Sequence, residues 1–430
     1  MNLISRWEIN KVVCHSREDG NLGLDACLHR HDNHFISCLK RNTSTIFSIT
    51  ALIFFANPCQ AATKTFIREY TYQASDYDSR LTCQAIALSE VKRLLLEEIG
   101  TYLVSGTTVQ NGMVVSDDIS VYTAGAVQTK VMDQRWDGKT YWLKAQIQAD
   151  PDSVSTAVAR LREDKTKTRE LESLKASSEK ALAEIAKLNK ALERASSDNS
   201  RFADQIKYLQ SAQKLSAVQS AQQGLAALES GDATTALTAF TRSLEADPND
   251  AISLVNRGIA YARLNDHKKA VPDYDRALKA SANDHRIYYN RGIAYYHLKE
   301  YTQALNDFNR SLLLKPDNSK TYFNRALTYE KMGNWKLAQL DYSKAIKLDP
   351  TDIQAYNNRG AVYLQQKLYA KAVTDFNKMI EIDPTFSDGY LNRAGVHAIR
   401  GDMAAALADA RKAAQLGSAE AKLLLERLGQ

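Results

Sequence analysis

The sequence predicts a mainly α-helical protein: a solenoid of six helix pairs, preceded by a helical linker and a small α+β domain. Two observations lead to this fold class. The chain repeats with a period of 34 residues from Ala217 onward, without insertion, and two places in every repeat hold only glycine or alanine. Units of this length bury their apolar faces only against neighbouring units, so they form stacked arrays. The repeats begin at Ala217, Ala251, His285, Ser319, Ile353 and Ser387.

Each repeat is expected to contain two short helices that cross at close range. A small residue on each helix lets the backbones approach, while aromatic rings at the eleventh and twenty-fourth places fill the space around the contact. Proline at the thirty-second place of four repeats ends the second helix. The eighth place holds Gly224, Gly258, Gly292, Ala326, Gly360 and Ala394, and the twentieth holds Ala236, Ala270, Ala304, Ala338, Ala372 and Ala406.

This pattern resembles the tetratricopeptide repeat, and the resemblance extends over residues 217–430. It implies an α-solenoid in which the first helix of each repeat lines a concave face. The first and last repeats lose several of the shared side chains, as terminal repeats that act as caps do. We expect Ala421–Leu428 to form a final covering helix.

Residues 1–62 have the pattern of a leader that ends in a secretory signal. Lys40 and Arg41 precede an apolar run over Ile46–Ala56, and small residues, Ala61 and Ala62, follow it. The apolar run is too short to span a bilayer comfortably, which is typical of a signal peptide. We expect cleavage after either alanine, which makes the protein exported and periplasmic. If the segment stays uncut, it anchors the protein to the membrane with the rest facing the periplasm.

The first 38 residues are rich in cysteine and histidine, which are suitable zinc ligands. They lack paired Cys-x-x-Cys spacing, and no apolar periodicity would build a fold around a metal. We therefore favour a leader, with translation starting after Met1, over a zinc site, and we predict no cofactor and no metal. The candidate ligands are Cys14, His15, Cys27, His29, His31, His34 and Cys38.

Residues 63–150 are expected to form the small α+β domain. Phe66–Tyr72 has the pattern of a strand, and Asn111-Gly112 and Asp137-Gly138 are hairpin turn signals. One set of apolar residues has helical spacing and another alternates as in a half-buried strand. The helical set is Leu81, Leu88, Val91, Leu95 and Ile99, and the alternating set is Tyr141, Leu143, Ala145, Ile147 and Ala149.

The same segment is similar to the small amino-terminal domain of flagellar assembly protein T and of related envelope lipoproteins. The similarity lies in the helix start at Ala85–Ala87, the turn at Gly125 and the strand WDGKTYWLKAQI. It implies a domain that docks to the cell envelope and has no chemistry of its own.

Residues 151–216 are expected to be a helical linker with a coiled-coil seam. Apolar residues recur at alternating steps of three and four once Ser178 and Asn199 are counted, which favours self-association into a homo-oligomer. The alternative is an intramolecular hairpin broken at Ala195–Ser200, where Asp198 or Ser200 caps a second helix. The seam residues are Leu171, Leu174, Ala181, Ile185, Leu188, Leu192, Ala195, Phe202, Ile206 and Leu209.

A charge correlation within the repeats predicts ion pairs. Five repeats carry arginine at the seventh place and aspartate at the twenty-third, whereas the first repeat has Gln223 and Ala239 at these places. Because both charges are lost together, we expect a charge-assisted contact between the two helices of each repeat, with a structural role. The predicted pairs are Arg257 with Asp273, Arg291 with Asp307, Arg325 with Asp341, Arg359 with Asp375, and Arg393 with Asp409.

The concave places of repeats two to four predict a partner surface. The resemblance implies that asparagine at the sixth place can bond to a peptide backbone, and Ile252, Val255 and Ile259 begin an apolar series that is rimmed by basic residues. Apolar side chains on the open face of a solenoid mark such a surface; the alternative for some of them is the core between repeats. The predicted groove comprises Tyr289, Asn290, Ile293, Tyr296, Lys320, Phe323, Asn324 and Leu327, with Arg286, His297 and Lys331 at its rim.

The known carboxylate clamp of this repeat family is not expected. Val255 and Ile259 stand where that clamp needs lysine and asparagine, although Asn290 and Lys320 fit two of its later places. The groove is therefore expected to recognise its partner through other contacts.

Composition and motifs point away from catalysis and from nucleic acid. The net charge is +6 over 430 residues, with both signs interspersed along the repeats, so there is no basic stripe for nucleic-acid binding. We find no catalytic carboxylate pair, Gly-x-Ser-x-Gly, His-Glu-x-x-His or phosphate-binding loop. The sequence therefore favours a non-catalytic periplasmic adaptor that binds a protein or peptide in its groove. The alternatives are a structural component of a secretion-type or flagellar-type envelope assembly, and an accessory factor for cell-wall enzymes.

Overall fold

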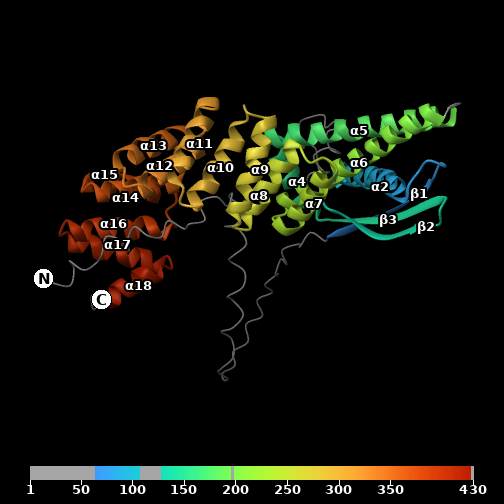
Figure 1. Cartoon of the computed structure of the whole chain (residues 1–430). Helices are drawn as coiled ribbons and strands as arrows, with labels where there is room; N and C mark the ends of the chain where they lie inside the picture. Colours follow the sequence, from blue (N-terminus) through green and yellow to red (C-terminus); the bar gives the residue numbers. More distant parts are fainter. Residues whose placement is uncertain (1–62, 107–126, 195–197, 428–430) are drawn as a thin grey trace, which may run out of the picture. The chain divides into compact units, whose positions relative to one another are not determined.

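The structure, a computed structural model, describes residues 63–106, 127–194 and 198–427. They fall into two compact units, which we call the amino-terminal unit (63–282) and the carboxy-terminal unit (283–427) (Figure 1). The predicted fold class is correct, because helix pairs dominate and the strands lie near the amino terminus. The predicted leader and the Asn111-Gly112 turn lie outside the described residues.

Three antiparallel strands form the sheet of the small domain. Strands β1 (Lys64–Gln73), β2 (Thr129–Trp136) and β3 (Thr140–Ala149) lie in the order β1-β3-β2. The predicted Asp137-Gly138 turn joins β2 to β3, and Gly138 has a φ of 97° there. The Asp137 carboxylate accepts hydrogen bonds from the backbone N–H groups of Lys139 and Thr140, which holds the turn closed.

Helix α2 (Arg80–Gly106) covers one face of this sheet. The predicted alternation in β3 is confirmed, since its odd-numbered residues are buried against Val91, Leu95 and Ile99. The prediction is wrong for Leu81, which is 76% exposed. Cys83 and Ala87 fill the core at that end of α2 instead.

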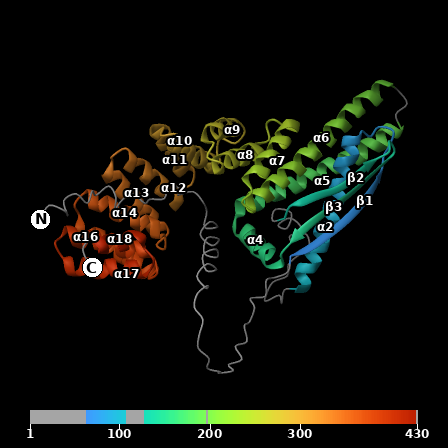
Figure 2. The same cartoon turned by 90° about the horizontal axis from the view of Figure 1, so that it is seen from below.

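The linker is a short helix, α4 (Pro151–Glu163), followed by a hairpin of α5 (Lys165–Arg194) and α6 (Asp198–Glu229). Both views show α5 and α6 side by side (Figure 1, Figure 2). Lys167 near the start of α5 forms an ion pair with Glu229 at the end of α6, so the two helices are antiparallel. The hairpin alternative is therefore correct.

The single seam predicted through residues 171–209 is wrong beyond the break between the helices. Phe202 is 66% exposed, and Ile206 and Leu209 are also exposed. Tyr208, Ala212 and Leu215 face Ile185, Leu188 and Leu192 in their place. The chain reverses after Arg194, so the heptad phase of α5 does not continue into α6. The buried residues of the α5 seam pack within the chain.

The small domain is fastened to the hairpin by the loop between β1 and α2. The Asp78 carboxylate accepts hydrogen bonds from the hydroxyl groups of Tyr72 and Tyr208 and from the backbone N–H of Ser75. Burial, reinforced by Asp78, raises the pKa of Tyr208 well above its ordinary value. Farther along α6, Gln219 donates to the carbonyl of Ala85 over 2.8 Å. These contacts join the domain and hairpin into one unit.

The first repeat shares a helix with the linker. Helix α6 runs without a break through residues 216 and 217, where we expected a domain boundary, and its final turns pair with α7 (Ala233–Ala246). The second repeat consists of α8 (Ala251–Arg263) and α9 (His267–Ala280). Both belong to the amino-terminal unit.

The carboxy-terminal unit holds the other four repeats and a final helix. Consecutive pairs pack in chain order, and the last helix packs on the sixth pair at the predicted covering position. The first helices are α10 (His285–His297), α12 (Ser319–Lys331), α14 (Ile353–Gln365) and α16 (Ser387–Ile399). The second helices are α11 (Tyr301–Leu314), α13 (Trp335–Leu348), α15 (Tyr369–Ile382) and α17 (Met403–Gln415), and the final helix is α18 (Ala419–Arg427).

Glycine at the eighth place sets the close approach inside a repeat. A Cβ on Gly258 would lie 2.5 Å from the ring of Tyr274, and one on Gly360 would lie 2.6 Å from the ring of Phe376. Both distances are shorter than a van der Waals contact, so the ring occupies the volume of the missing side chain. The contact joins the eighth place to the aromatic ring at the twenty-fourth, while the alanines at the twentieth place are buried.

A left-handed residue at the fifteenth place turns the chain between the two helices of each repeat. This place is glycine in three repeats, where a positive φ costs little. Lysine occupies it in two others, with φ of 63° at Lys299 and 59° at Lys367. The six residues are Gly231, Asn265, Lys299, Gly333, Lys367 and Gly401.

Candidate partner-binding surface

In the carboxy-terminal unit, α10 and α12 carry the predicted groove. The side-chain amide of Asn324 on α12 donates to the hydroxyl of Tyr289 on α10 over 3.1 Å. The rings of Tyr289 and Phe308 pack at a tilt with their centroids 6.3 Å apart. The rings of Phe323 and Tyr342 pack edge to face with their centroids 5.6 Å apart. Both groove rings are half-buried. They pack against rings of the second helices and remain partly exposed.

The remaining predicted residues divide between the groove and the core. Asn290, Tyr296 and Leu327 are half-buried, and Lys320 is exposed. Ile293 is 3% exposed and packs with Ala304 and Phe308 in the core of its repeat. Its assignment to the groove is therefore wrong, because the ninth place of this repeat points at the second helix. The core alternative holds for this residue.

The asparagines of the sixth place share one conformation in two repeats. Asn324 donates to the carbonyl of Lys320 over 2.9 Å, and Asn256 donates to the carbonyl of Ile252 over 2.9 Å. Each bond reaches back four residues along the same helix and fixes the side chain. The same amide nitrogen also donates outside its helix. In repeat four this contact goes to Tyr289.

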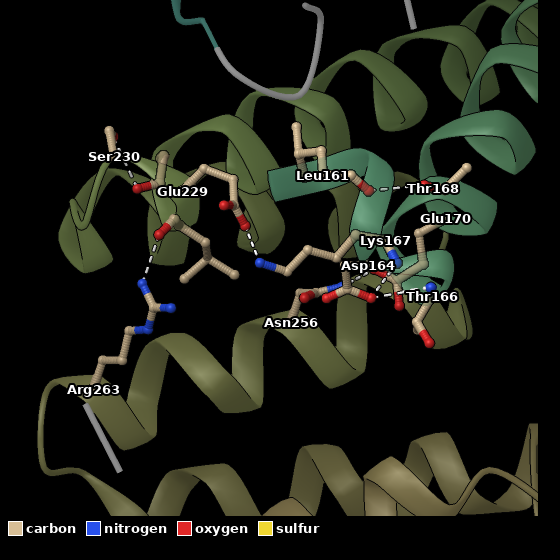
Figure 3. Close-up of polar contacts among 12 residues, drawn as sticks. Leu161, Asp164, Thr166, Lys167, Thr168, Glu170, Glu229, Ser230, Asn256 and Arg263 are labelled. Carbon is tan, nitrogen blue, oxygen red and sulfur yellow. Dashed lines mark hydrogen bonds and ion pairs between the residues drawn. The ribbon is translucent and has the colours of Figure 1, made fainter. Parts of the chain in front are cut away.

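In the amino-terminal unit, the corresponding surface is occupied by the chain itself (Figure 3). The amide of Asn256 on α8 donates to the carboxylate of Glu170 on α5 over 3.3 Å, in a buried environment. Leu171 and Leu174 are buried in the same cluster, against which Ile252 and Ile259 pack. The predicted apolar series of repeat two is therefore covered. No pattern in the sequence predicted this contact, which joins residues 86 positions apart.

The segment that covers repeat two, residues 161–174, is held by several polar contacts. The Asp164 carboxylate accepts from the backbone N–H groups of Thr166 and Lys167 and so begins α5. The Thr168 hydroxyl donates to the carbonyl of Leu161 over 2.9 Å. As Figure 3 shows, Lys167 reaches Glu229, which fixes the start of α5 against the end of α6. We call this segment the elbow.

The structure brings the two members of all five predicted arginine–aspartate pairs together. Each guanidinium donates from Nε and Nη2 to the two carboxylate oxygens of its partner over 2.7–2.9 Å. The aspartates are buried, whereas the guanidinium groups are partly exposed. Burial raises the pKa of Asp375, and Arg359 opposes that shift. The pairs join the two helices of each repeat, as expected for a structural role.

The arginines also couple consecutive repeats, which the sequence reasoning missed. The Nη1 atom of Arg325 donates to Asn309 over 2.7 Å, and that of Arg393 donates to Asn377 over 2.6 Å. Arg359 reaches Ser343 in the same way. These acceptors all stand at the twenty-fifth place of the preceding repeat. That recurring polar place was the signal that could have revealed the link.

The described residues show no other chemical centre. No group of three potential metal ligands occurs among residues 63–106, 127–194 and 198–427. The alternative zinc ligands, residues 14–38, lie outside these ranges. Burial, reinforced by Asp78, raises the pKa of Cys83 to about 12, so its thiol is unreactive at neutral pH. In the same ranges, no helix is long and apolar enough to cross a membrane.

Family models identify the repeats. Residues 222–285 match one model of the tetratricopeptide repeat, and residues 285–318, 319–352 and 353–386 match a second. These segments are tetratricopeptide repeats, as the sequence resemblance predicted. No curated protein matches the chain.

Several solved structures are similar to part of the chain. A crystal structure of MamA is 27% identical and covers 37% of this chain and 94% of its own, with a TM-score of 0.36. YrrB, described as a TPR protein with an unusual peptide-binding site, is 23% identical and covers 44% of this chain and 99% of its own, with a TM-score of 0.39. PilF of Pseudomonas aeruginosa is 19% identical and covers 50% of this chain and 99% of its own, with a TM-score of 0.43.

Proposed function

We propose that the protein is a non-catalytic adaptor that holds a protein or peptide partner on the concave face of repeats three and four. The observation that carries this proposal is the pairing of half-buried rings with an asparagine amide, at Tyr289, Phe323 and Asn324. Rings already fixed by the core lose little conformational freedom on binding. An amide on the same face can bond to a partner backbone. Tetratricopeptide repeats act as scaffolds for protein interactions, which agrees with this use.

We also propose that the adaptor is exported to the periplasm and docks to the envelope through residues 63–150. The signal pattern before residue 63 supports export. In the small domain, α2 covers one face of the sheet, while the other face carries Trp142 and Lys144, which bond to Glu69. That face is available to an envelope partner. The runner-up function, a structural component of an envelope assembly, is favoured by the same open face.

Partner capture tests the adaptor function. In the Tyr289→Ala/Phe323→Ala double variant, recovery of partner from the envelope fraction should fall about tenfold, because both apolar anchors are lost. Helicity measured by circular dichroism should stay unchanged. The matched control is Leu313→Ala/Leu340→Ala, which removes two exposed side chains from second helices. Equal recovery with all three proteins would overturn the proposal.

A further inference from the structure

We infer that the partner of repeats three and four is an amphipathic α-helix that carries an acidic residue next to leucines. This inference rests on the proposed function and names the chemistry of its partner. Its basis is the elbow, which shows how a concave surface of this chain is filled. The start of α5 supplies a helix with Glu170, Leu171 and Leu174 on the side that meets repeat two.

The receptor side of that contact is repeated two units later. Asn256 and Asn324 stand at the same place of their repeats and bond to the carbonyl four residues earlier at the same distance, 2.9 Å. In its second hydrogen bond, the Asn256 amide donates to the carboxylate of Glu170. The Asn324 amide donates instead to the neutral hydroxyl of Tyr289. A carboxylate is the stronger acceptor, so an incoming acidic side chain can replace the hydroxyl.

The apolar side of the contact is repeated in part. Ile252 and Ile259 pack against the cluster that contains the elbow leucines. Leu327 stands at the place of Ile259 and is half-buried, the exposed Lys320 replaces Ile252, and the half-buried Phe323 adds apolar surface on α12. A helix with leucines one and four residues after its acidic side chain presents them on one side, as the elbow does.

Charge favours an acidic occupant. Helix α10 contains no acidic residue, and the single one in α12, Glu330, accepts a hydrogen bond from the buried hydroxyl of Tyr342. Lys320 and Lys331 are exposed on α12. A partner helix with net negative charge therefore meets a surface of opposite sign, which favours association and selects against basic helices.

A peptide copied from the chain's own α5 tests the inference. The probe is a fluorescent synthetic peptide with the sequence of residues 165–182, titrated into the full-length protein. We expect saturable binding, and roughly tenfold weaker binding of a peptide carrying Glu170→Gln, because a charge-assisted hydrogen bond is lost. Asn324→Asp in the protein should weaken binding of the original peptide by a similar factor, because the Glu170 carboxylate of the peptide would then meet a second carboxylate.

Controls locate the site. Asn306→Asp makes the same substitution at an exposed residue of α11 and should leave binding unchanged. A peptide with Glu170→Lys should regain affinity for the Asn324→Asp protein. Binding that Asn324→Asp does not affect would mean that the peptide binds elsewhere, for example by displacing the elbow from Asn256, and would overturn the inference. If no peptide binds while partner capture still depends on Tyr289 and Phe323, the helix chemistry is wrong and the adaptor function stands.

Discussion

At the residue scale, the fifteenth place of two repeats holds a strained backbone that a substitution by glycine would relieve. Lys299 and Lys367 adopt a left-handed backbone that glycine adopts in three other repeats. A side chain with a Cβ pays about 1–2 kcal/mol in this conformation. The lysines therefore make the turn at a cost in stability that glycine avoids.

Lys299→Gly and Lys367→Gly should each stabilise the protein by about 1 kcal/mol, because glycine removes the steric cost at positive φ but loses more entropy on folding. The measurement is the midpoint of thermal or urea unfolding. Gly333→Lys should destabilise by a similar amount. Lys336→Gly, in the exposed first turn of α13, is the control and should not stabilise. Stabilisation by the control as well would show that the turn geometry is not responsible.

Removing one partner of the ion pair between Arg359 and Asp375 should lower the stability of the protein more than replacing both partners by apolar residues. Asp375→Ala leaves the guanidinium without its carboxylate and should destabilise by about 3–5 kcal/mol. Replacing both partners by apolar residues, Arg359→Met with Asp375→Leu, should cost less than Asp375→Ala alone. The first repeat already lacks both charges, with Gln223 and Ala239 in their place. A double variant that is as unstable as the sum of its single variants would contradict a direct pair.

His285 should make stability depend on pH. Burial lowers its pKa, assisted by Lys315, and its position in the first turn of α10 also disfavours the charged ring. Asp284 and Asp317 oppose this shift, while Arg286 adds to it. Since the folded-state pKa lies below the unfolded-state value of about 6.5, the contribution of the neutral ring is present above that value and lost as the pH falls through the folded-state pKa.

His285→Asn should therefore reduce the loss of thermal stability between about pH 7.5 and about pH 5. The measurement is the unfolding temperature of both proteins across this range. An identical pH dependence in the two proteins would show that this histidine does not contribute.

At the element scale, the hairpin of α5 and α6 distinguishes seam residues that the sequence treated alike. Leu192 is 0% exposed and Leu209 is 40% exposed, although both fit one heptad pattern. Leu192→Ala should cost about 2–5 kcal/mol because it opens a cavity. Leu209→Ala should change stability by less than about 0.5 kcal/mol, as surface substitutions do. The measurement is the free energy of unfolding in urea. Similar losses of stability from both variants would support the continuous coiled coil instead of the hairpin.

Local and periodic features were predictable from the sequence, and long-range contacts were not. The 34-residue period predicted the helix pairs, a close helix approach at the small residues and the arginine pairs, because each of these features recurs from repeat to repeat. The phase of α6 was missed because a reversal of the chain resets the heptad count. The contact of Glu170 with Asn256 was missed because a single pair of distant residues leaves no periodic signal.

At the scale of the whole molecule, the first helices of both units carry an asparagine beside apolar side chains, but the surroundings of this asparagine differ. The amino-terminal unit covers the concave place of repeat two with its own elbow. The carboxy-terminal unit presents Tyr289, Phe323 and Asn324 on the corresponding helices. The filled surface indicates the fitting chemistry, and we propose that the second surface, of related design, takes a partner.

The most direct test of this account is crosslinking in intact cells from a photoreactive residue placed at position 323, compared with the same residue at position 340. Phe323 lies on the first helix of repeat four, and Leu340 is exposed on the second. The account predicts a specific adduct with another protein from position 323 and none from position 340. Adducts from 340 alone, or equally from both, would contradict it.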